Sequence, residues 1–273
     1  MSSDLKKYKV FFGGCARNIG AHLDKSLALL EEMRQLFAPE SVIYFIENDS
    51  TDNTVEKLQE FDKTHENVFI YKFNGLAQKI PKRTARLAFC RNFIVNIIQT
   101  KYADFDYFIN VDLDNILNED TIGGLKHCFT LERPWDALFA NSQPVYYDIW
   151  ALRSKALGIT YDCWDRIHHD YQKGIPHFIG KIPHVKAFQQ HISPGRDLIE
   201  VQSAFGGFGI YKVAAIRGCK YVGEIAQCEF NETTACNGEC CEHVQFHADM
   251  IEKNGAKLYI APFLIATAAM EHV

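Results

Sequence analysis

Two aspartates stand one residue apart at the end of an apolar run. Asp112 and Asp114 follow YFINV (107–111), which has the composition of a buried β-strand. Because side chains alternate along a strand, residues two apart point the same way, so both carboxylates can face one cation. Mg²⁺ and Mn²⁺ prefer oxygen ligands and keep positions open for phosphate oxygens. The pair therefore predicts a divalent-metal site, although a solvated strand end or a helix N-cap explains two such aspartates more simply when they are taken alone.

Further polar segments follow the apolar runs earlier in the chain. CARN (15–18) comes after the first run, and ENDSTDNT (47–54) comes after the second. In a parallel sheet the carboxyl ends of the strands meet at one edge, and ligands bind there. We therefore expect a nucleotide site at this edge, with Arg17, Arg86 and Arg91 as candidate ligands of a diphosphate. A solvated or salt-bridged surface role is the alternative for each arginine, and a turn with a helix cap is the alternative for 47–54.

Strand-like and helix-like segments alternate through the first half of the chain. Apolar residues recur every three to four positions in the helix-like segments. Expected strands are 9–14, 41–48, 67–73 and 106–115, and expected helices are 16–37, 50–61 and 83–102. This alternation indicates βαβ units. The predicted fold class is α/β, a Rossmann-like, mixed but mainly parallel sheet that is flanked by helices.

The rhythm changes after Asp114. Strands are expected at 136–143, 146–154, 201–213 and 257–266, and a helix is expected to start near Glu242. Residues 158–197 are rich in His, Lys, Tyr, Gly and Pro without a sustained period. We expect an irregular excursion there that acts as a mobile lid, because loops of this length in compact domains are usually functional or disordered.

Length and charge exclude several classes of protein. The chain has 273 residues, 47% of them hydrophobic, which suits one large core in a single domain. A net charge of −5 without a dominant basic block argues against a broad nucleic-acid or anionic-membrane surface. Nowhere do about 18 apolar residues run uninterrupted, and no signal peptide is recognisable at the N-terminus. We therefore expect a cytoplasmic protein, and the sequons at 48–50 and 231–233 agree weakly with that, since the first lies in the candidate site.

Four of the nine cysteines crowd into one short segment beside His243. They are Cys228, Cys236, Cys240 and Cys241. The spacing lacks the paired C-x-x-C knuckles that are typical of a structural zinc site. Plain thiols on a tight loop are the preferred interpretation, ahead of a disulfide and then zinc.

Seven motifs, taken in order, resemble one known family. The likeness covers about residues 9–155 and 200–265 and is to metal-dependent nucleotide-sugar glycosyltransferases of the GT-A fold. It is greatest to the fungal capsule-associated α-mannosyltransferase group and its bacterial and viral relatives. The motifs are FFGGCARNIG…LALLEEM, VIYFIENDSTDNT, RLAFCRN, DYFINVDLDN, YYDIWALR, SAFGGFGIYK and CEHVQFHADM.

The resemblance implies roles for these residues. It implies one GT-A domain over 1–273, with a nucleotide-binding half at 9–118 and a sugar and acceptor half at 135–273. It implies that Asp114 ligates Mn²⁺ or Mg²⁺ and acts in catalysis, and that Asp112 lies against the ribose or the metal. Contact with the base or ribose is implied for the residues of the second strand end: Glu47, Asn48, Asp49 and Asp52.

The later motifs carry the remaining candidates. Gly206 and Gly207 would let a donor sugar approach the backbone, or they mark a bulge. Glu242 matches an acid that faces the acceptor, which would be the general base of an inverting enzyme or would stabilise the sugar in a retaining one. His243 is a metal or phosphate ligand, or a structural side chain. His272 is available as a third metal ligand.

The predicted function is transfer of a sugar from a nucleoside-diphosphate sugar to a glycan or another hydroxyl acceptor. GDP-mannose is the donor by resemblance, with UDP-sugars as the alternative.

The aromatic segment around Tyr146, Tyr147, Asp148 and Trp150 is expected on the sugar side of the cleft, or as an edge strand packed on the core. A sugar-phosphate nucleotidyltransferase is a rival, but it would carry a longer Gly-rich loop with a nearby Lys after the first strand. A non-catalytic carbohydrate- or partner-binding module is the other rival, and it would not need the aspartate pair. The choice of acceptor, the stereochemistry and the oligomeric state stay open.

Overall fold

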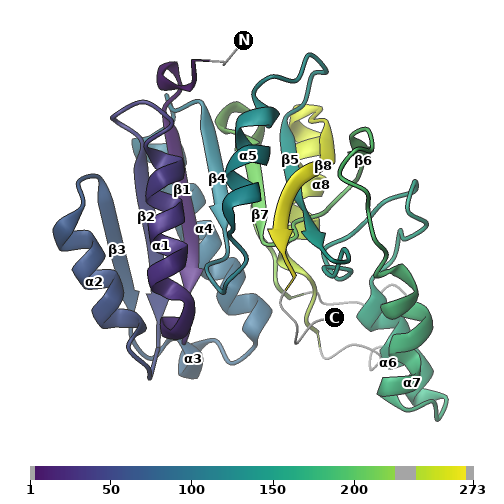
Figure 1. Cartoon of the computed structure of the whole chain (residues 1–273). Helices are drawn as coiled ribbons and strands as arrows, with labels where there is room; N and C mark the ends of the chain where they lie inside the picture. The colour runs from purple at the N-terminus through teal and green to yellow at the C-terminus, as the bar shows by residue number, and fades with distance from the viewer. Residues whose placement is uncertain (1–3, 225–237, 269–273) are drawn as a thin grey trace.

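Four parallel strands form one half of the sheet (Figure 1). The computed structural model describes residues 4–224 and 238–268. All seven residues of β2 (Val42–Asn48) are buried, as expected for a parallel strand that is covered on both faces. It lies between β1 (Val10–Ala16) and β3 (Val68–Phe73), and β1 also pairs with β4 (Tyr107–Val111). The predicted βαβ alternation is therefore confirmed.

The second half of the sheet mixes strand directions. Its strands are β5 (Ala137–Gln143), β6 (Ile199–Glu200), β7 (Phe208–Lys212) and β8 (Leu258–Thr267). The order across the sheet is β3-β2-β1-β4-β7-β5-β8-β6. β7 runs antiparallel to both β4 and β5, whereas β5 and β8 are parallel and β6 is antiparallel to β8. One eight-stranded sheet of mixed direction thus joins both halves of the chain, as predicted.

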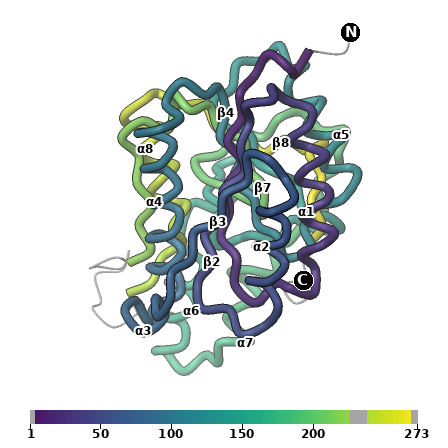
Figure 2. Tube along the Cα trace, turned by 90° about the vertical axis from the view of Figure 1, so that its left-hand side faces the viewer, coloured from purple at the N-terminus to yellow at the C-terminus, as the bar shows by residue number. Residues whose placement is uncertain are grey.

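Helices cover both faces of this sheet (Figure 2). On one face lie α1 (Gly20–Arg34), α2 (Thr54–Thr64) and α5 (Glu119–Cys128), and on the other lie α4 (Arg83–Lys101) and α8 (Glu242–Asn254). Short elements connect them: η1 (Leu5–Lys7), α3 (Leu76–Lys79), η2 (Lys186–Phe188) and η3 (Val213–Ile216). No helix in the described ranges has both the length and the apolar character needed to span a membrane.

The hydrophobic core is divided by the sheet into two layers. Phe11 belongs to the layer that contains Ile94 of α4 and Phe246 of α8. Its neighbour Phe12 belongs to the layer that contains Leu27 of α1. Successive strand residues point to opposite faces, so a strand between two helical layers is buried on both faces and is mostly apolar. Continuous apolar runs such as VFF and VIYFI follow from this geometry.

The strand predicted over 146–154 is wrong. The Tyr147 amide donates to Ser142 Oγ (3.0 Å), the Ile149 amide to the Tyr147 carbonyl (2.9 Å), and the Leu152 amide to the Ile149 carbonyl (3.2 Å). These local bonds use the amides that a strand would offer to a neighbour. The segment is therefore a loop of tight turns.

The excursion at 158–197 is more regular than expected. It contains two helices, α6 (Cys163–Gln172) and α7 (His177–His184), which pack against each other as a hairpin. Asp162 starts α6, because its carboxylate accepts from the Trp164 amide (2.9 Å) and the Asp165 amide (3.4 Å). The prediction of an irregular segment is wrong for these residues, whereas a role as a mobile lid stays a prediction.

Candidate active site

Two adjoining cavities lie where β1, β2 and β4 end. The larger has a volume of about 900 Å³ and reaches from β4 to the loop at 147–151, the α6–α7 hairpin and the start of α8. The smaller, about 200 Å³, lies beside the ends of β1 and β2. The wall between them is lined from both sides by the same five residues: Arg83, Leu87, Arg91, Asp112 and Asp114. The aspartate pair is thus at the junction of the cavities.

Asp112 and Asp114 line both cavities, while Leu113 between them is 1% exposed, packs in the core and also borders the smaller cavity. The Asp112 amide donates to the Gly207 carbonyl (2.8 Å), which fixes the end of β4 against the segment before β7. Burial raises the pKa of Asp112 to about 6, an effect that Arg91 opposes and Asp114 reinforces. Two carboxylates in this position favour a bound cation, because its charge offsets their repulsion.

Arg91 connects this pair to the start of α8. Its guanidinium lies 3.1 Å from Asp112 Oδ1 and forms a second ion pair with Glu242. The Arg91 side chain is 5% exposed and that of Glu242 is 6% exposed. The guanidinium also lies over the Phe205 ring, 5.1 Å from its centroid. Residues from α4, from the position after β4 and from α8, which are distant in the sequence, thus form one charged chain that is buried at Arg91 and Glu242.

His243 lies beside Glu242 and lines the larger cavity. Its ring stacks on Phe205, with 4.0 Å between centroids. Burial and the nearby Arg91 lower the pKa of His243 well below its ordinary value, so the imidazole is neutral. Neither of its ring nitrogens has a hydrogen-bond partner among the described residues. Its role as a metal or phosphate ligand stays a prediction.

The polar segment after β2 has mainly a capping role. Asp49 accepts from the Gly75 amide (2.6 Å) and the Ala77 amide (2.7 Å) at the start of α3. Asp52 accepts from the Gly20 amide (2.9 Å) and the Thr54 amide (3.0 Å), which begin α1 and α2. Hydrogen bonds lower the pKa of both carboxyl groups, chiefly the one from the Ala77 amide for Asp49 and the one from the Thr54 side chain for Asp52. Neither aspartate lines either of the two cavities described above, so contact with a base or ribose stays a prediction for them.

Of the other polar residues at this edge of the sheet, some are buried and some line the smaller cavity. Glu47 is 1% exposed, and its Oε1 accepts from the Ser50 amide (2.8 Å). Its Oε2 is buried without a partner among the described residues. Asn48, Arg17 and Arg86 line the smaller cavity, and the Arg86 guanidinium also donates to the Ile80 carbonyl (2.8 Å). Three of the four polar residues predicted at 47–52 thus lie outside the cavity and only Asn48 lines it.

Gly206 and Gly207 are explained by packing within the chain. Both have positive φ, +65° and +83°, a conformation that side chains rarely adopt. A Cβ on Gly206 would lie 2.7 Å from the Ala140 carbonyl oxygen, and one on Gly207 would lie 2.6 Å from Ile116 Cδ1. Because the backbone turns here, the predicted strand at 201–213 is wrong before residue 208. Contact between these glycines and a donor sugar stays a prediction.

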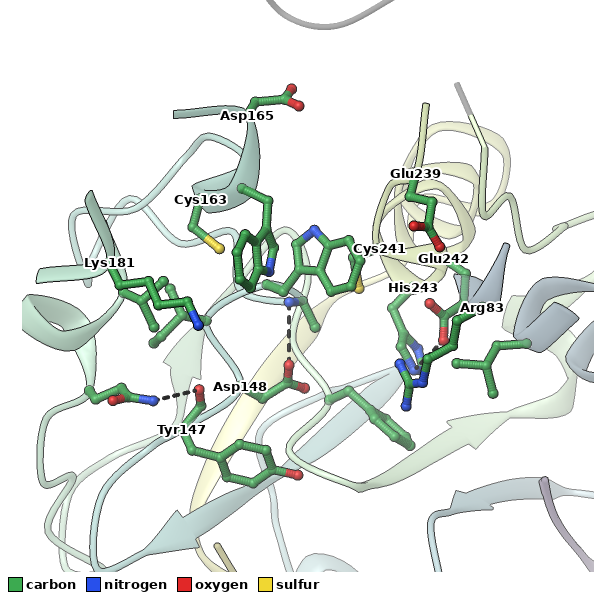
Figure 3. A pocket seen from close by; sticks show the side chains of 18 of the residues that line it. Arg83, Tyr147, Asp148, Cys163, Asp165, Lys181, Glu239, Cys241, Glu242 and His243 are labelled. Carbon is green, nitrogen blue, oxygen red and sulfur yellow. Dashed lines mark hydrogen bonds and ion pairs between the residues drawn. The ribbon is translucent and has the colours of Figure 1, made fainter. Parts of the chain in front are cut away.

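Part of the cavity wall was not predicted from the sequence (Figure 3). In this view Lys181 of α7 and Arg83 of α4 reach in from opposite sides, with Asp148 between them. Trp164 and His168 of α6 also line the cavity. No local period or spacing marks these residues, because the hairpin reaches the site only in the folded chain. The expected sugar-side residues Tyr147, Asp148 and Trp150 line the cavity, whereas Tyr146 is 1% exposed in the core.

The cysteine-rich segment lies partly outside the described residues. Cys228, Cys236, His272 and the sequon at 231–233 are outside them. Cys240 and Cys241 are free thiols, and Cys240 Sγ lies 3.2 Å from the Val222 carbonyl oxygen. Within residues 4–224 and 238–268, no three His, Cys, Asp or Glu side chains form a group that could hold a metal ion. The interpretation of the four cysteines as plain thiols stays a prediction, because two of them lie outside the described residues.

Two solved structures resemble this architecture. A mannosyltransferase from Pyrobaculum calidifontis, in complex with GDP-Man and Mn²⁺, has a TM-score of 0.51 and 13% sequence identity; the match covers 96% of this chain and 57% of that one. S. aureus TarS 1–349, in complex with UDP-GlcNAc, also has a TM-score of 0.51 and 13% identity, over 97% of this chain and 60% of that one. The chain has the GT-A fold.

This similarity is one of fold. The chain spans less than two thirds of the length of either neighbour. No family model matches the sequence, and no curated protein matches it. The expected GT-A architecture is therefore confirmed, whereas the finer resemblance to the fungal capsule-associated group is not.

Proposed function

We propose that the chain is a glycosyltransferase that moves a sugar from a nucleoside-diphosphate sugar to a hydroxyl acceptor. The observation that carries the proposal is the position of Asp112 and Asp114 in the wall shared by two cavities. Such a donor has a nucleoside on one side of its diphosphate and a sugar on the other. The smaller cavity, beside the ends of β1 and β2, suits the nucleoside, and the larger suits the sugar and the acceptor. GDP-mannose and UDP-sugars are the donor candidates.

The residues at the junction fit Mn²⁺ or Mg²⁺. Both aspartates offer oxygen ligands, and the described residues supply no cluster of three or more ligating side chains. Such ions commonly take one or two carboxylates and complete their shell with water and substrate phosphates. When bound, the ion would neutralise charge on the departing diphosphate. His243 is the further candidate ligand from this chain.

The other residues of the wall have separate roles in this proposal. Arg83 and Arg17 would stabilise the phosphates by charge-assisted hydrogen bonds. Arg91 would hold Asp112 in position, since its guanidinium lies 3.1 Å from that carboxylate. On the acceptor side, Glu242 and Asp148 are two of the carboxylates that line the larger cavity, together with Asp165 and Glu239. Glu242 is the acid implied by resemblance, and its ion pair with Arg91 also makes it a positioning residue.

The test is calorimetric titration with GDP, UDP and their sugar conjugates, with Mn²⁺ or with a chelator. We expect one nucleotide to bind in a Mn²⁺-dependent manner, and Asp114→Ala to weaken binding at least about tenfold, as loss of one charged ligand would. In a thermal melt, the ligand at one hundred times its dissociation constant should add about 2.7 kcal/mol of stability. Asp62→Ala, an exposed aspartate of α2, is the matched control and should bind like the wild type.

Two outcomes would contradict the proposal. If nucleotide binds equally well with Mn²⁺ and with chelator, and equally well to the wild type and to Asp114→Ala, the proposed metal site is wrong. No binding of any nucleotide would favour a carbohydrate- or partner-binding module instead. If a donor does bind, release of nucleoside diphosphate from it would distinguish an enzyme from a module that only binds.

A further inference from the structure

A cluster of exposed apolar side chains lies on the α6–α7 hairpin and its turn. Eight large apolar side chains are exposed among the described residues, and five of them lie here, so the exposure is concentrated. We call these five the hairpin patch: Tyr171, Ile175, Phe178, Ile179 and Ile182. Phe178 is 70% exposed and Ile182 is 54% exposed. Figures 1 and 2 show the hairpin at the periphery of the molecule, away from the helices that cover the sheet.

The sequence around the hairpin patch, between Asp170 and Asp197, carries only positive charges. Between Asp170 and Asp197 the sequence contains no aspartate or glutamate. It contains four permanent cations: Lys173, Lys181, Lys186 and Arg196. The whole chain carries a net charge of −5, which argued against a basic surface over the entire molecule. The stretch 171–196 is therefore a local exception in charge, although α6 itself also carries Asp165 and Asp170. Lys173 is exposed in the turn between α6 and α7, beside the patch residue Tyr171 in the sequence, whereas Lys181 and Lys186 also line the larger cavity.

The opposite side of the hairpin is attached to the protein. Gly180 is buried and faces Ile167 of α6. The Lys181 ammonium lies over the Trp164 ring, 5.0 Å from its centroid, and His184 Nε2 lies 2.9 Å from Asp170 Oδ2. These contacts hold α7 in one orientation. The hairpin patch is therefore presented outward rather than packed into the core.

We propose that the α6–α7 hairpin docks the protein on the surface of an anionic lipid bilayer. An amphipathic helix with basic residues and exposed Phe, Tyr and Ile lies in the interface, with its apolar side among the acyl chains and its cations at the headgroups. A second copy of the chain is a poorer occupant. A two-fold contact would place the same surface of both copies together, and the cations would then face each other.

This docking bears on the cavity as well. Trp164 and Lys181 of the hairpin line the larger cavity, so the cavity would open beside the bilayer. The inference does not rest on the proposed glycosyl transfer, because membrane binding is measured without donor or catalysis. Its failure and the failure of the proposed function are thus distinguishable.

The experiment is flotation of the whole chain with phosphatidylcholine vesicles, with and without phosphatidylglycerol. The wild type should float with the anionic vesicles and lose binding at high salt. Phe178→Ser/Ile182→Ser should reduce binding at least about tenfold, because the buried apolar area is lost. Lys173→Glu should reduce it by about tenfold. Phe89→Ser, at an exposed phenylalanine of α4 outside the hairpin patch (40% exposed), is the control and should bind like the wild type.

Several outcomes would overturn the inference. One is absence of binding to anionic vesicles by a wild-type protein that melts cooperatively. Another is equal binding by Phe178→Ser/Ile182→Ser and by the control. A third is a concentration-dependent dimer in sedimentation that Phe178→Ser/Ile182→Ser abolishes, without vesicle binding, which would make the patch an interface between copies. A thermal melt of Phe178→Ser/Ile182→Ser and of Lys173→Glu should match the wild type, since these side chains are exposed.

Discussion

Arg91 is a charged side chain with almost no access to water, and it is paired with two carboxylates. Removing Glu242 takes away the buried partner of Arg91 and leaves Asp112, whose side chain is 33% exposed, as its other carboxylate partner. Glu242→Ala should therefore lower the free energy of unfolding by about 3–5 kcal/mol, measured by urea denaturation. Glu252→Ala, an exposed glutamate of the same helix, should change stability by less than about 0.5 kcal/mol. A small effect of Glu242→Ala would mean that Arg91 is stabilised by Asp112 alone.

Asp52 ties the starts of α1 and α2 together through its two carboxylate oxygens. Asp52→Ala should cost about 1 kcal/mol at neutral pH, in the lower part of the range for helix caps because the side chain is exposed. The folded-state pKa of Asp52 is lowered. Its contribution is therefore complete above the unfolded pKa of about 3.9 and is lost as the pH falls through the folded value. Urea denaturation should show the difference between wild type and variant shrinking in acid, and a constant difference would contradict this.

At the scale of elements, substituting two different glycines by alanine should have opposite effects on stability. Gly206 has φ +65°, and its Cβ would meet the Ala140 carbonyl oxygen at 2.7 Å. Gly206→Ala should therefore destabilise the protein by more than about 1–2 kcal/mol, the cost of left-handed backbone alone. Gly123 lies inside α5 with open space around it. Gly123→Ala should stabilise the protein by about 0.5–1 kcal/mol, and a thermal melt of both variants tests the contrast.

The elements that the sequence predicted well are those with a strong period. β1 to β4, α1, α2 and α4 have continuous apolar runs or a three-to-four spacing, because each is covered by a neighbouring layer. α5 was missed because Gly123 and Gly124 weaken its pattern, although Asn118 and Thr121 form a capping box at its start. The loop at 146–154 has the composition of a strand, but local hydrogen bonds to Ser142 and Tyr147 decide its conformation.

At the scale of the whole molecule, the site joins segments that only the fold brings together. Asp112 and Asp114 were recognisable from their spacing, and Arg91 was recognisable as a cation on a helix behind the same edge. The ion pair of Arg91 with Glu242 could not be recognised from the sequence, since it joins α4 to α8. The cations and rings of the α6–α7 hairpin were also not predicted, because nothing in the local pattern says which cavity that hairpin lines. Sequence patterns reveal the half of the site that sits on regular strand ends.

The place of β7 between β4 and β5 has a consequence for how the chain must fold during its synthesis. β1, β2, β3 and β4 can pair with one another as soon as they leave the ribosome, but the outer edge of β4 then waits for β7. β5 waits for both of its partners, β7 and β8, which come later in the chain. An unpaired apolar strand edge is a template for aggregation. A chain that ends at residue 200 should therefore be insoluble on expression, and the growing chain should need protection at that edge until β7 is complete.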